Sequence, residues 1–228
     1  MPYVIRWPHK RGIAVAVASL SLLAGASPAA AYTSGWQGQS GQYGQYSQYQ
    51  PSAPSGAGCP IPASSAVLAP LGDLANYSLL PGGDFEDSTT GWSLNGASVV
   101  PGNEPWQVGG ASDSQSLSIP AGASAVSPTL CLTSQLPSWR FFAQAADGSF
   151  ATKLQVTVEY ADNHGNRGEV SAAKLFGGTF ASWQPTSSLP LGSVLSPGTA
   201  VNVRFVFAAE SSGGAWNIDD VYVDPYAR

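Results

Sequence analysis

Two adjacent carboxylates, Asp219 and Asp220, lie inside an otherwise apolar, β-prone run near the end of the chain, residues 216–225. A carboxylate that is buried without a partner loses several kcal/mol of hydration, so it is usually paired, hydrogen-bonded or bound to a metal ion. Apart from Arg228, no Lys or Arg lies within ten residues of this run. The group that compensates the two acids must therefore come from a distant part of the sequence.

The most suitable partner is the acidic segment 80–87, which carries Asp84 and Glu86. Acidic side chains that face other acidic side chains suggest a cation between them. Successive side chains of a strand point to opposite faces, so only one of Asp219 and Asp220 is expected to point inward. In a regular strand this is Asp220, and a bulge would reverse the choice.

A resemblance to a known fold rests on these two ends of the domain. The opening residues 83–86 (Gly-Asp-Phe-Glu) and 91–92 (Gly-Trp), with the closing residues 218–221 (Ile-Asp-Asp-Val), resemble the galactose-binding-like jelly roll. Many secreted carbohydrate-binding modules have this fold, and the resemblance covers roughly residues 77–225. It implies that the first and last strands run close together and that carboxylates and backbone carbonyls hold a structural calcium ion near them.

Glu86 and Asp220 are the leading pair of calcium ligands, and Asp84 and Asp219 are further candidates. Calcium takes six to eight oxygen ligands, so backbone carbonyls and water would complete the coordination. The alternative is that these acids cap turns or accept hydrogen bonds from backbone N–H groups.

Residues 1–31 are typical of a secretory signal peptide. Arg6, Lys10 and Arg11 precede an apolar run over residues 13–26, and Ala29-Ala30-Ala31 fits the small-residue rule for cleavage. The apolar run is shorter than the roughly 20 residues that span a bilayer, so export with cleavage is favoured over a membrane anchor. We therefore expect a secreted, extracellular or cell-surface protein.

The charge of the exported chain excludes several partners. Removal of three of the nine basic residues leaves six Lys and Arg against 14 Asp and Glu, a net charge of −8. Nucleic acids and anionic membrane surfaces need basic patches, so neither is an expected partner. A weakly charged surface rich in Ser, Thr, Asn, Gln and Gly suits a neutral ligand, and sugars are one such class.

Residues 32–58 have low complexity, with Gly, Gln, Tyr and Ser followed by a Pro/Ser/Gly stretch. The tyrosines at 43, 46 and 49 have no aliphatic residue between them, so the segment is expected to be disordered. It is either a flexible tether or a segment that associates through Tyr and Gln.

The folded domain is predicted to span residues 59–228. Its two cysteines, Cys59 and Cys131, are the only ones in an exported chain, so they are expected to form one disulfide.

Short strands separated by turn residues fill the domain from residue 73 onward. Residues 153–160 and 201–207 alternate most clearly, and Leu154, Val156 and Val158 form one face of the first of these strands. The other expected strands are 97–100, 115–119, 123–127, 129–132, 139–145, 168–173 and 183–189. No helical period extends beyond a turn near 64–74, so an all-β antiparallel β-sandwich or jelly roll is predicted.

Five tryptophans fall in the domain, and Trp92 and Trp216 are expected in the core. Sugar rings stack on aromatic planes while amides, carboxylates and Arg bind hydroxyls, so aromatic side chains beside polar groups are candidates for a binding site. The candidate residues are Asn103, Glu104, Trp106, Gln107, Arg140 and Trp183. Core packing of these residues is the alternative.

Catalysis has little support in the sequence. His164 lies in a polar turn, no Gly-x-Ser-x-Gly motif is present, and Asp219 and Asp220 cannot flank one glycosidic bond from opposite faces. The sequence therefore predicts a secreted, non-catalytic module that binds carbohydrate or a cell-envelope polymer. The alternatives are an adhesive surface protein with a self-associating tail and, third, an enzyme acting on glycans.

Overall fold

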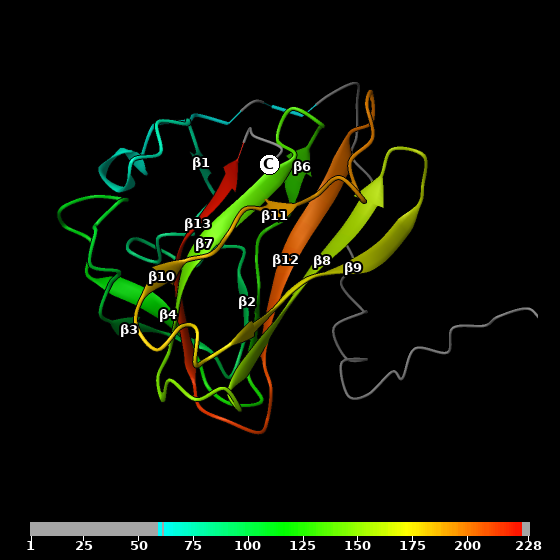
Figure 1. The fold of residues 1–228 in the computed structure, drawn as a ribbon. Coiled ribbons are helices and arrows are strands. Elements are labelled where there is room, and N and C mark those ends of the chain that lie inside the picture. Colours follow the sequence, from blue (N-terminus) through cyan, green and yellow to red (C-terminus); the bar gives the residue numbers. More distant parts are fainter. Residues whose placement is uncertain (1–58, 61, 225–228) are drawn as a thin grey trace, which may run out of the picture. The chain divides into compact units, whose positions relative to one another are not determined.

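The computed structural model describes residues 59–60 and 62–224, which form two antiparallel β-sheets packed face to face (Figure 1). The predicted all-β sandwich is therefore confirmed. The predicted signal peptide and the tail over residues 32–58 lie outside the described residues.

The first sheet has seven strands in the order β10-β7-β13-β4-β3, with β1 paired to β13 and β11 paired to β7. Its strands are β1 (Ser78–Leu79), β3 (Ser98–Pro101), β4 (Gln115–Ile119), β7 (Ser138–Ala145), β10 (Gln184–Pro185), β11 (Leu189–Pro190) and β13 (Trp216–Asp224).

The second sheet has six strands in the order β2-β5-β12-β8-β9, with β6 paired to β12. Its strands are β2 (Ser93–Asn95), β5 (Ser124–Val126), β6 (Leu130–Leu132), β8 (Lys153–Asp162), β9 (Arg167–Phe176) and β12 (Val201–Ala209).

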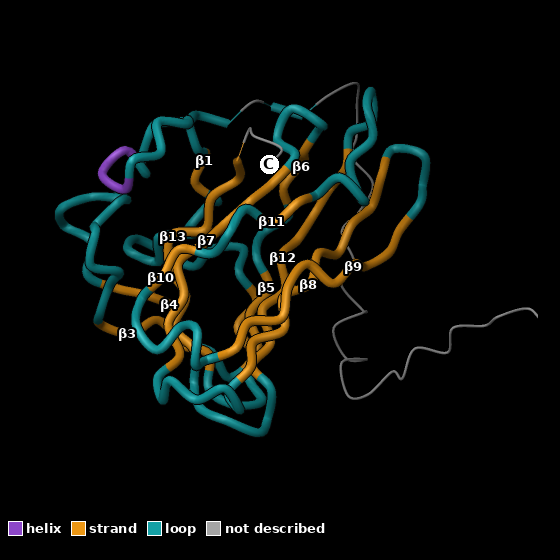
Figure 2. The backbone as a smooth tube through the Cα atoms, in the orientation of Figure 1, coloured by secondary structure: helices purple, strands orange, loops and turns teal. Residues whose placement is uncertain are grey.

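Helical structure among the described residues is a single turn of 3-10 helix, Ala69–Leu71, within the predicted turn at 64–74 (Figure 2). Pro70 lies in its first turn, and Gly72 ends it in the left-handed conformation with a φ of 82°. Glycine carries no Cβ and adopts this conformation without strain.

The core lies between the sheets and consists of the alternate side chains of the long strands. Leu154, Val156 and Val158 of β8 are fully buried, as their alternation predicted. Trp92 and Trp216 also lie in this core, which confirms their assignment. Trp139 is fully buried too, so it is not available for binding.

One predicted strand is divided in two. The segment 183–189 forms the two-residue strands β10 and β11, each paired to β7. Between them Thr186 turns its hydroxyl to the backbone N–H of Phe141 at 3.2 Å, and the Phe141 carbonyl accepts the Thr186 N–H at 2.8 Å. Pro185 and Pro190 cannot donate to a ladder, and the residue after each of them donates instead, Thr186 to Phe141 and Leu191 to the Pro137 carbonyl at 2.7 Å.

The first and last strands are adjacent, as the resemblance implied. Ser78 and Leu79 of β1 pair with Val223 and Tyr222 of β13. Backbone hydrogen bonds between Leu80 and Val221 and between Val221 and Gly83 extend this contact into segment 80–87. The two acidic segments are therefore close in space.

The orientation predicted for the two acids is wrong, because β13 contains an irregularity between Asp219 and Tyr222. Ile218 and Val221 both face the core, so the two acids between them are displaced from the core face. Asp219 and Asp220 both reach the loop over residues 102–113 instead of pointing to opposite faces.

A small apolar layer covers the outer face of the first sheet. Phe142 and Tyr222 pack there with Leu68, Tyr77 and Val108, and Trp106 and Trp183 are half-buried against them. The 3-10 turn and the loop over residues 102–113 thus rest on strands β7 and β13.

No helix among the described residues is long and apolar enough to cross a membrane.

The disulfide between Cys59 and Cys131 is present, with a Cα–Cα distance of 5.1 Å. Cys131 lies on β6, opposite Asn202 of β12, so the bond fixes the start of the described chain to the second sheet.

We expect the Cys59→Ser, Cys131→Ser double variant to melt well below the wild-type chain. The bond closes a loop with a sequence separation of 72 residues, and constraint of the unfolded chain over such a loop contributes about 4 kcal/mol. That corresponds to roughly 8–16 °C for a domain of this size. Calorimetry of the two proteins with and without reductant checks it, and equal melting temperatures would contradict it.

Candidate functional site

Two places on the first sheet gather the polar side chains that the sequence singled out. One is an acidic cluster beneath the loop over residues 102–113, made by Asp84, Glu86, Glu104, Asp113, Asp219 and Asp220. The other is a groove on the outer face of β7, which is called here the Arg140 groove.

In the acidic cluster, Asp220 is almost completely buried and has a positive φ of 50°. Its Oδ1 accepts a hydrogen bond from the Tyr222 hydroxyl at 3.0 Å. Its Oδ2 is buried and has no hydrogen-bond partner among the described residues. A buried carboxylate oxygen without a partner is costly, so this atom marks a place where a cation or a water molecule would be stabilised.

Asp113 is the second acid with such an oxygen, because its Oδ2 is also buried without a hydrogen-bond partner in the described part of the chain. A Cβ atom on Gly109 would lie 2.4 Å from Asp113 Oδ2 and 3.0 Å from Asp220 Oδ1. The two carboxylates therefore reach the same point beside Gly109, which has no side chain to fill it. The sequence reading missed Asp113, although its position just after the Gly109-Gly110 pair could have indicated it.

Glu86 is held by the backbone at the start of β4. Its Oε1 accepts the N–H groups of Ser114 at 2.7 Å and Gln115 at 2.6 Å, while its Oε2 accepts the Ser114 hydroxyl at 3.3 Å. Acceptance of backbone N–H groups was the alternative reading for these acids, and Glu86 does accept them. Burial raises the pKa of the Asp113 carboxyl, and the charge of Glu86 raises it further.

Asp219 and Glu104 are held by backbone N–H groups of strand β13 and of the loop over residues 102–113. Asp219 accepts the Asp220 N–H at 2.9 Å and is 3.5 Å from the Glu104 N–H. Glu104 is buried, and its two oxygens accept the N–H groups of Trp106 and of Val108, the latter at 2.6 Å. Glu104 thus shapes its own loop and does not project toward a ligand.

The electrostatics of the cluster disfavour its fully charged state. Burial and the charge of Asp220 raise the pKa of Asp219 to about 10. Burial raises the pKa of Asp220 to about 8, and the charges of Glu104, Asp113 and Asp84 act in the same direction. In the part of the chain that the structure describes, no three His, Cys, Asp or Glu side chains converge as a preformed metal site. The cluster nevertheless fits a hard cation, since it offers oxygen donors and excess negative charge.

The Arg140 groove has a volume of about 610 Å³ and lies where the 3-10 turn meets the outer face of β7. Its lining residues are Leu68, Leu71, Gly72, Asp73, Leu74, Arg140 and Pro185.

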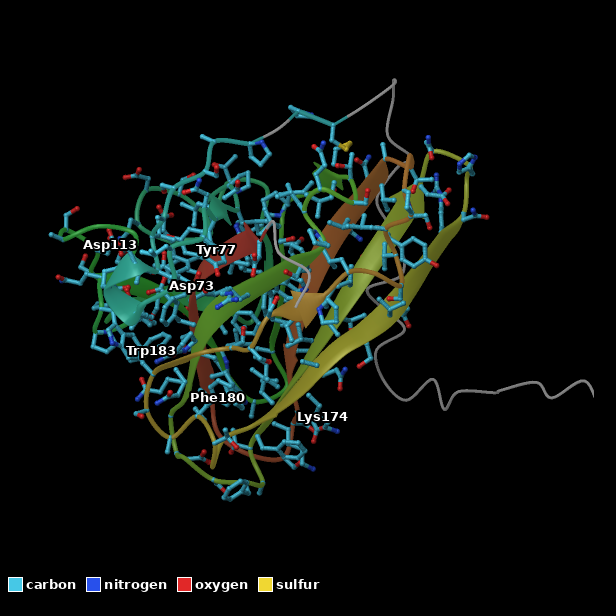
Figure 3. All side chains as sticks on the ribbon, turned by 45° about the horizontal axis from the view of Figure 1, so that its top comes forward. Asp73, Tyr77, Asp113, Lys174, Phe180 and Trp183 are labelled. Carbon is cyan, nitrogen blue, oxygen red and sulfur yellow. A yellow bond between two sulfur atoms is a disulfide. The ribbon has the colours of Figure 1, made fainter. Side chains whose placement is uncertain are left out.

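Arg140 holds the polar side of the groove. Its Nη2 lies 3.0 Å from Asp224 Oδ2, its Nη1 lies 3.8 Å from Asp73 Oδ2, and its guanidinium carbon is 5.0 Å from the centre of the Tyr77 ring. The Tyr77 hydroxyl donates to Asp73 at 2.7 Å. Burial raises the pKa of Tyr77, and this hydrogen bond raises it further. These contacts hold the donors and acceptors of the groove in place, and Figure 3 shows where Asp73 and Tyr77 lie on this face of the molecule.

The apolar side of the groove is exposed. Leu74 is 80% exposed and Leu71 is 36% exposed. Trp183 is half-buried and precedes Gln184 and Pro185 of β10, and Trp106 packs on Phe142 with ring centres 5.5 Å apart. Within the groove, aliphatic surface therefore lies beside the Arg140 and Asp73 side chains.

The structure brings together only part of the predicted binding set. Arg140 lines the groove, whereas Trp106 and Trp183 do not line it and pack instead on the small apolar layer of the first sheet. Gln107 is exposed at a turn with a φ of 50°, while the side-chain amide of Asn103 is buried without a hydrogen-bond partner among the described residues. Sequence reading missed Asp73, Tyr77 and Pro185, because nothing in their local pattern shows that they fold onto β7.

No protein-family model matches this chain, and no curated protein matches it. Solved structures do match in fold. The CBM22-1–GH10 modules of endo-1,4-β-D-xylanase 10B from Clostridium thermocellum, complexed with xylohexaose, are 14% identical with a TM-score of 0.40, over 63% of this chain and 28% of that one.

Two further matches are single modules. The family 11 carbohydrate-binding module of the cellulase Lic26A-Cel5E of Clostridium thermocellum is 14% identical over 66% of this chain and 95% of that one, with a TM-score of 0.40. The CBM22-1 xylan-binding domain of Paenibacillus barcinonensis Xyn10C is 13% identical over 75% and 97%, also with a TM-score of 0.40. Carbohydrate-binding modules are thus among the structures that this chain resembles, while its own site and ligand must come from its own residues.

In a chelating buffer, we expect the melting temperature to fall as the pH rises from about 4 to about 8. The pKa of Asp220 is raised from 3.8 to about 8 in the folded state, so the folded chain keeps a proton that the unfolded chain releases. Asp220→Asn should make this fall shallower, and Asp87→Asn, at an exposed position, should not. Thermal melts across this pH range check it, and an unchanged slope in Asp220→Asn would contradict the assignment.

Proposed function

We propose that this chain is an exported, non-catalytic binding protein whose β-sandwich holds a neutral carbohydrate or a cell-envelope polymer in the Arg140 groove. The groove itself carries the proposal, because it combines the fixed guanidinium of Arg140 and the carboxylate of Asp73 with exposed apolar surface. Arg and Asp side chains bind hydroxyl groups, and apolar and aromatic surface accepts the C–H faces of sugar rings.

The charge of the groove supports a neutral ligand. Arg140 is already paired with Asp224 and lies near Asp73, so no free positive charge is left to select an anion. A volume of about 610 Å³ is within the range of small-molecule sites. The Cys59–Cys131 disulfide supports export, because disulfides persist in oxidising compartments.

We also propose that the acidic cluster holds a structural calcium ion. Asp113 and Asp220 would supply oxygens beside Gly109, with Glu86 and Asp84 completing the negative charge and backbone carbonyls and water filling the remaining positions. A bound ion would offset the burial and the neighbouring negative charges that raise the pKa of Asp220, and it would keep its carboxylate charged. The ion would stabilise the sandwich and take no part in a reaction.

Glycan binding is tested with residues 32–228 on a glycan array, followed by calorimetry on the best ligand. We expect Arg140→Lys to weaken binding about tenfold, because Lys keeps the charge and loses the fixed fork of donors. Leu74→Ala should also weaken it, because Leu74 lines the groove and is 80% exposed. Phe150→Ala is the control, since Phe150 is 68% exposed and lies outside the groove. Absence of any bound glycan, or equal losses in the control, would contradict the proposed function.

Calcium binding is tested by melting the chain in chelator and in millimolar calcium at pH 7.5. An ion present at a hundred times its dissociation constant adds about 2.7 kcal/mol, which corresponds to roughly 5–11 °C. Asp113→Asn and Asp220→Asn should each remove the difference between the two buffers. Glu169→Gln, at an exposed position on β9, should retain it. Identical wild-type melts, with no metal retained by elemental analysis, would rule out the ion.

A further inference from the structure

A second cavity of about 610 Å³ lies between the free edges of the two sheets. On one side is β9, which pairs only with β8 among the described strands, and on the other are β10 and β11, which pair only with β7. The buried side chains of Leu175 and Phe180 form part of its lining, and we call it the β9–β10 cavity.

Polar side chains line the same cavity. Thr179, Gln184, Ser187 and Lys174 contribute hydroxyl, amide and amine groups. Gln184 and Ser187 are exposed, and Lys174 is ion-paired with Glu210 on its outer side. The cavity therefore offers hydrogen-bonding groups beside apolar lining without an uncompensated charge.

Pro185 lines both this cavity and the Arg140 groove. It belongs to β10, which is only two residues long, so a single narrow strand separates the two hollows. Figure 3 shows Trp183, Phe180 and Lys174 following one another along this side of the molecule, from the groove toward β9. The two hollows thus meet across one residue that has no N–H group to hydrogen-bond.

We propose that the Arg140 groove and the β9–β10 cavity form one continuous track, and that its ligand is a linear, uncharged oligosaccharide chain crossing Pro185. The inference rests on the proposed function and specifies its ligand as an internal stretch of a polysaccharide. The Arg140 groove binds the sugar units on one side of Pro185, and Gln184 and Lys174 bind the sugar units on the other side.

A protein partner fits the β9–β10 cavity less well. Stable protein interfaces bury about 800 Å² on each side around an apolar centre that is depleted in charged residues. Here Lys174 and Glu210 lie beside a narrow hollow, and the large apolar side chains exposed on the described surface are Leu71, Leu74, Phe150 and Phe176. None of these four lines the β9–β10 cavity.

The experiment measures affinity against chain length. Residues 32–228 are titrated calorimetrically with β-1,4-linked gluco-, xylo- and galacto-oligosaccharides of two to six units. We expect the affinity for one of these series to rise at least tenfold between the disaccharide and the hexasaccharide. Gln184→Ala and Lys174→Ala should each lower the hexasaccharide affinity about tenfold and change the disaccharide affinity less than twofold.

Lys153→Ala is the matched control. Lys153 is the other partner of Glu210, at 3.6 Å, and does not line the cavity, so its loss should leave both affinities unchanged. Equal affinity for the disaccharide and the hexasaccharide, or equal losses for both in Gln184→Ala, would overturn the continuous track while leaving the groove as a binding site. Absence of binding to every series would overturn the track together with the proposed function.

Discussion

The packing of Trp139 against the second sheet is the contact on which the rest of the molecule depends. The centre of its ring lies 3.9 Å from the ring centre of Phe205 and 5.9 Å from that of Phe207, both on β12. Phe141, two residues further along β7, packs on Phe207 at 5.1 Å. Since side chains alternate along a strand, an inward Trp139 and Phe141 fix Arg140 and Phe142 on the outer face. The core thereby decides which residues can form a groove.

The outer face of the first sheet consequently carries both apolar and charged side chains. The segments that cover this face must bury Phe142 and Tyr222 and must also compensate the charges of Arg140, Asp219, Asp220 and Asp224. Asp73, just after the 3-10 turn, lies near the arginine, and the loop over residues 102–113 supplies the Glu104 N–H to Asp219, while Asp113 of this loop adds a further negative charge beside Asp220. Loops thus supply much of the groove and of the acidic cluster, while the strands beneath them keep both in place.

Sequence reading predicted the sandwich well because alternation along a strand is a local property. Residues 115–119 were predicted as a strand and are β4, and the run at 216–225 became β13. The adjacency of the two acidic segments was also foreseen, on the strength of the resemblance. The groove was not, because Asp73 and Pro185 reach Arg140 from positions 67 and 45 residues away, and no local pattern encodes such a meeting. The prediction of which way Asp219 and Asp220 face was wrong for a related reason. One irregular position in a strand reverses the facing that strict alternation predicts for the residues after it.

The irregularity in β13 decides which changes in the length of this strand the fold can accommodate. Ile218 and Val221 both face the core with two acids between them, which is one residue more than a regular strand would place there. Loss of either aspartate from the gene would leave a regular strand, in which Ile218, Val221 and Val223 keep the core face and Tyr222 keeps the outer face. A deletion of one codon here would therefore remove the irregularity without inverting the central strand of the first sheet, and it would take one carboxylate from the acidic cluster.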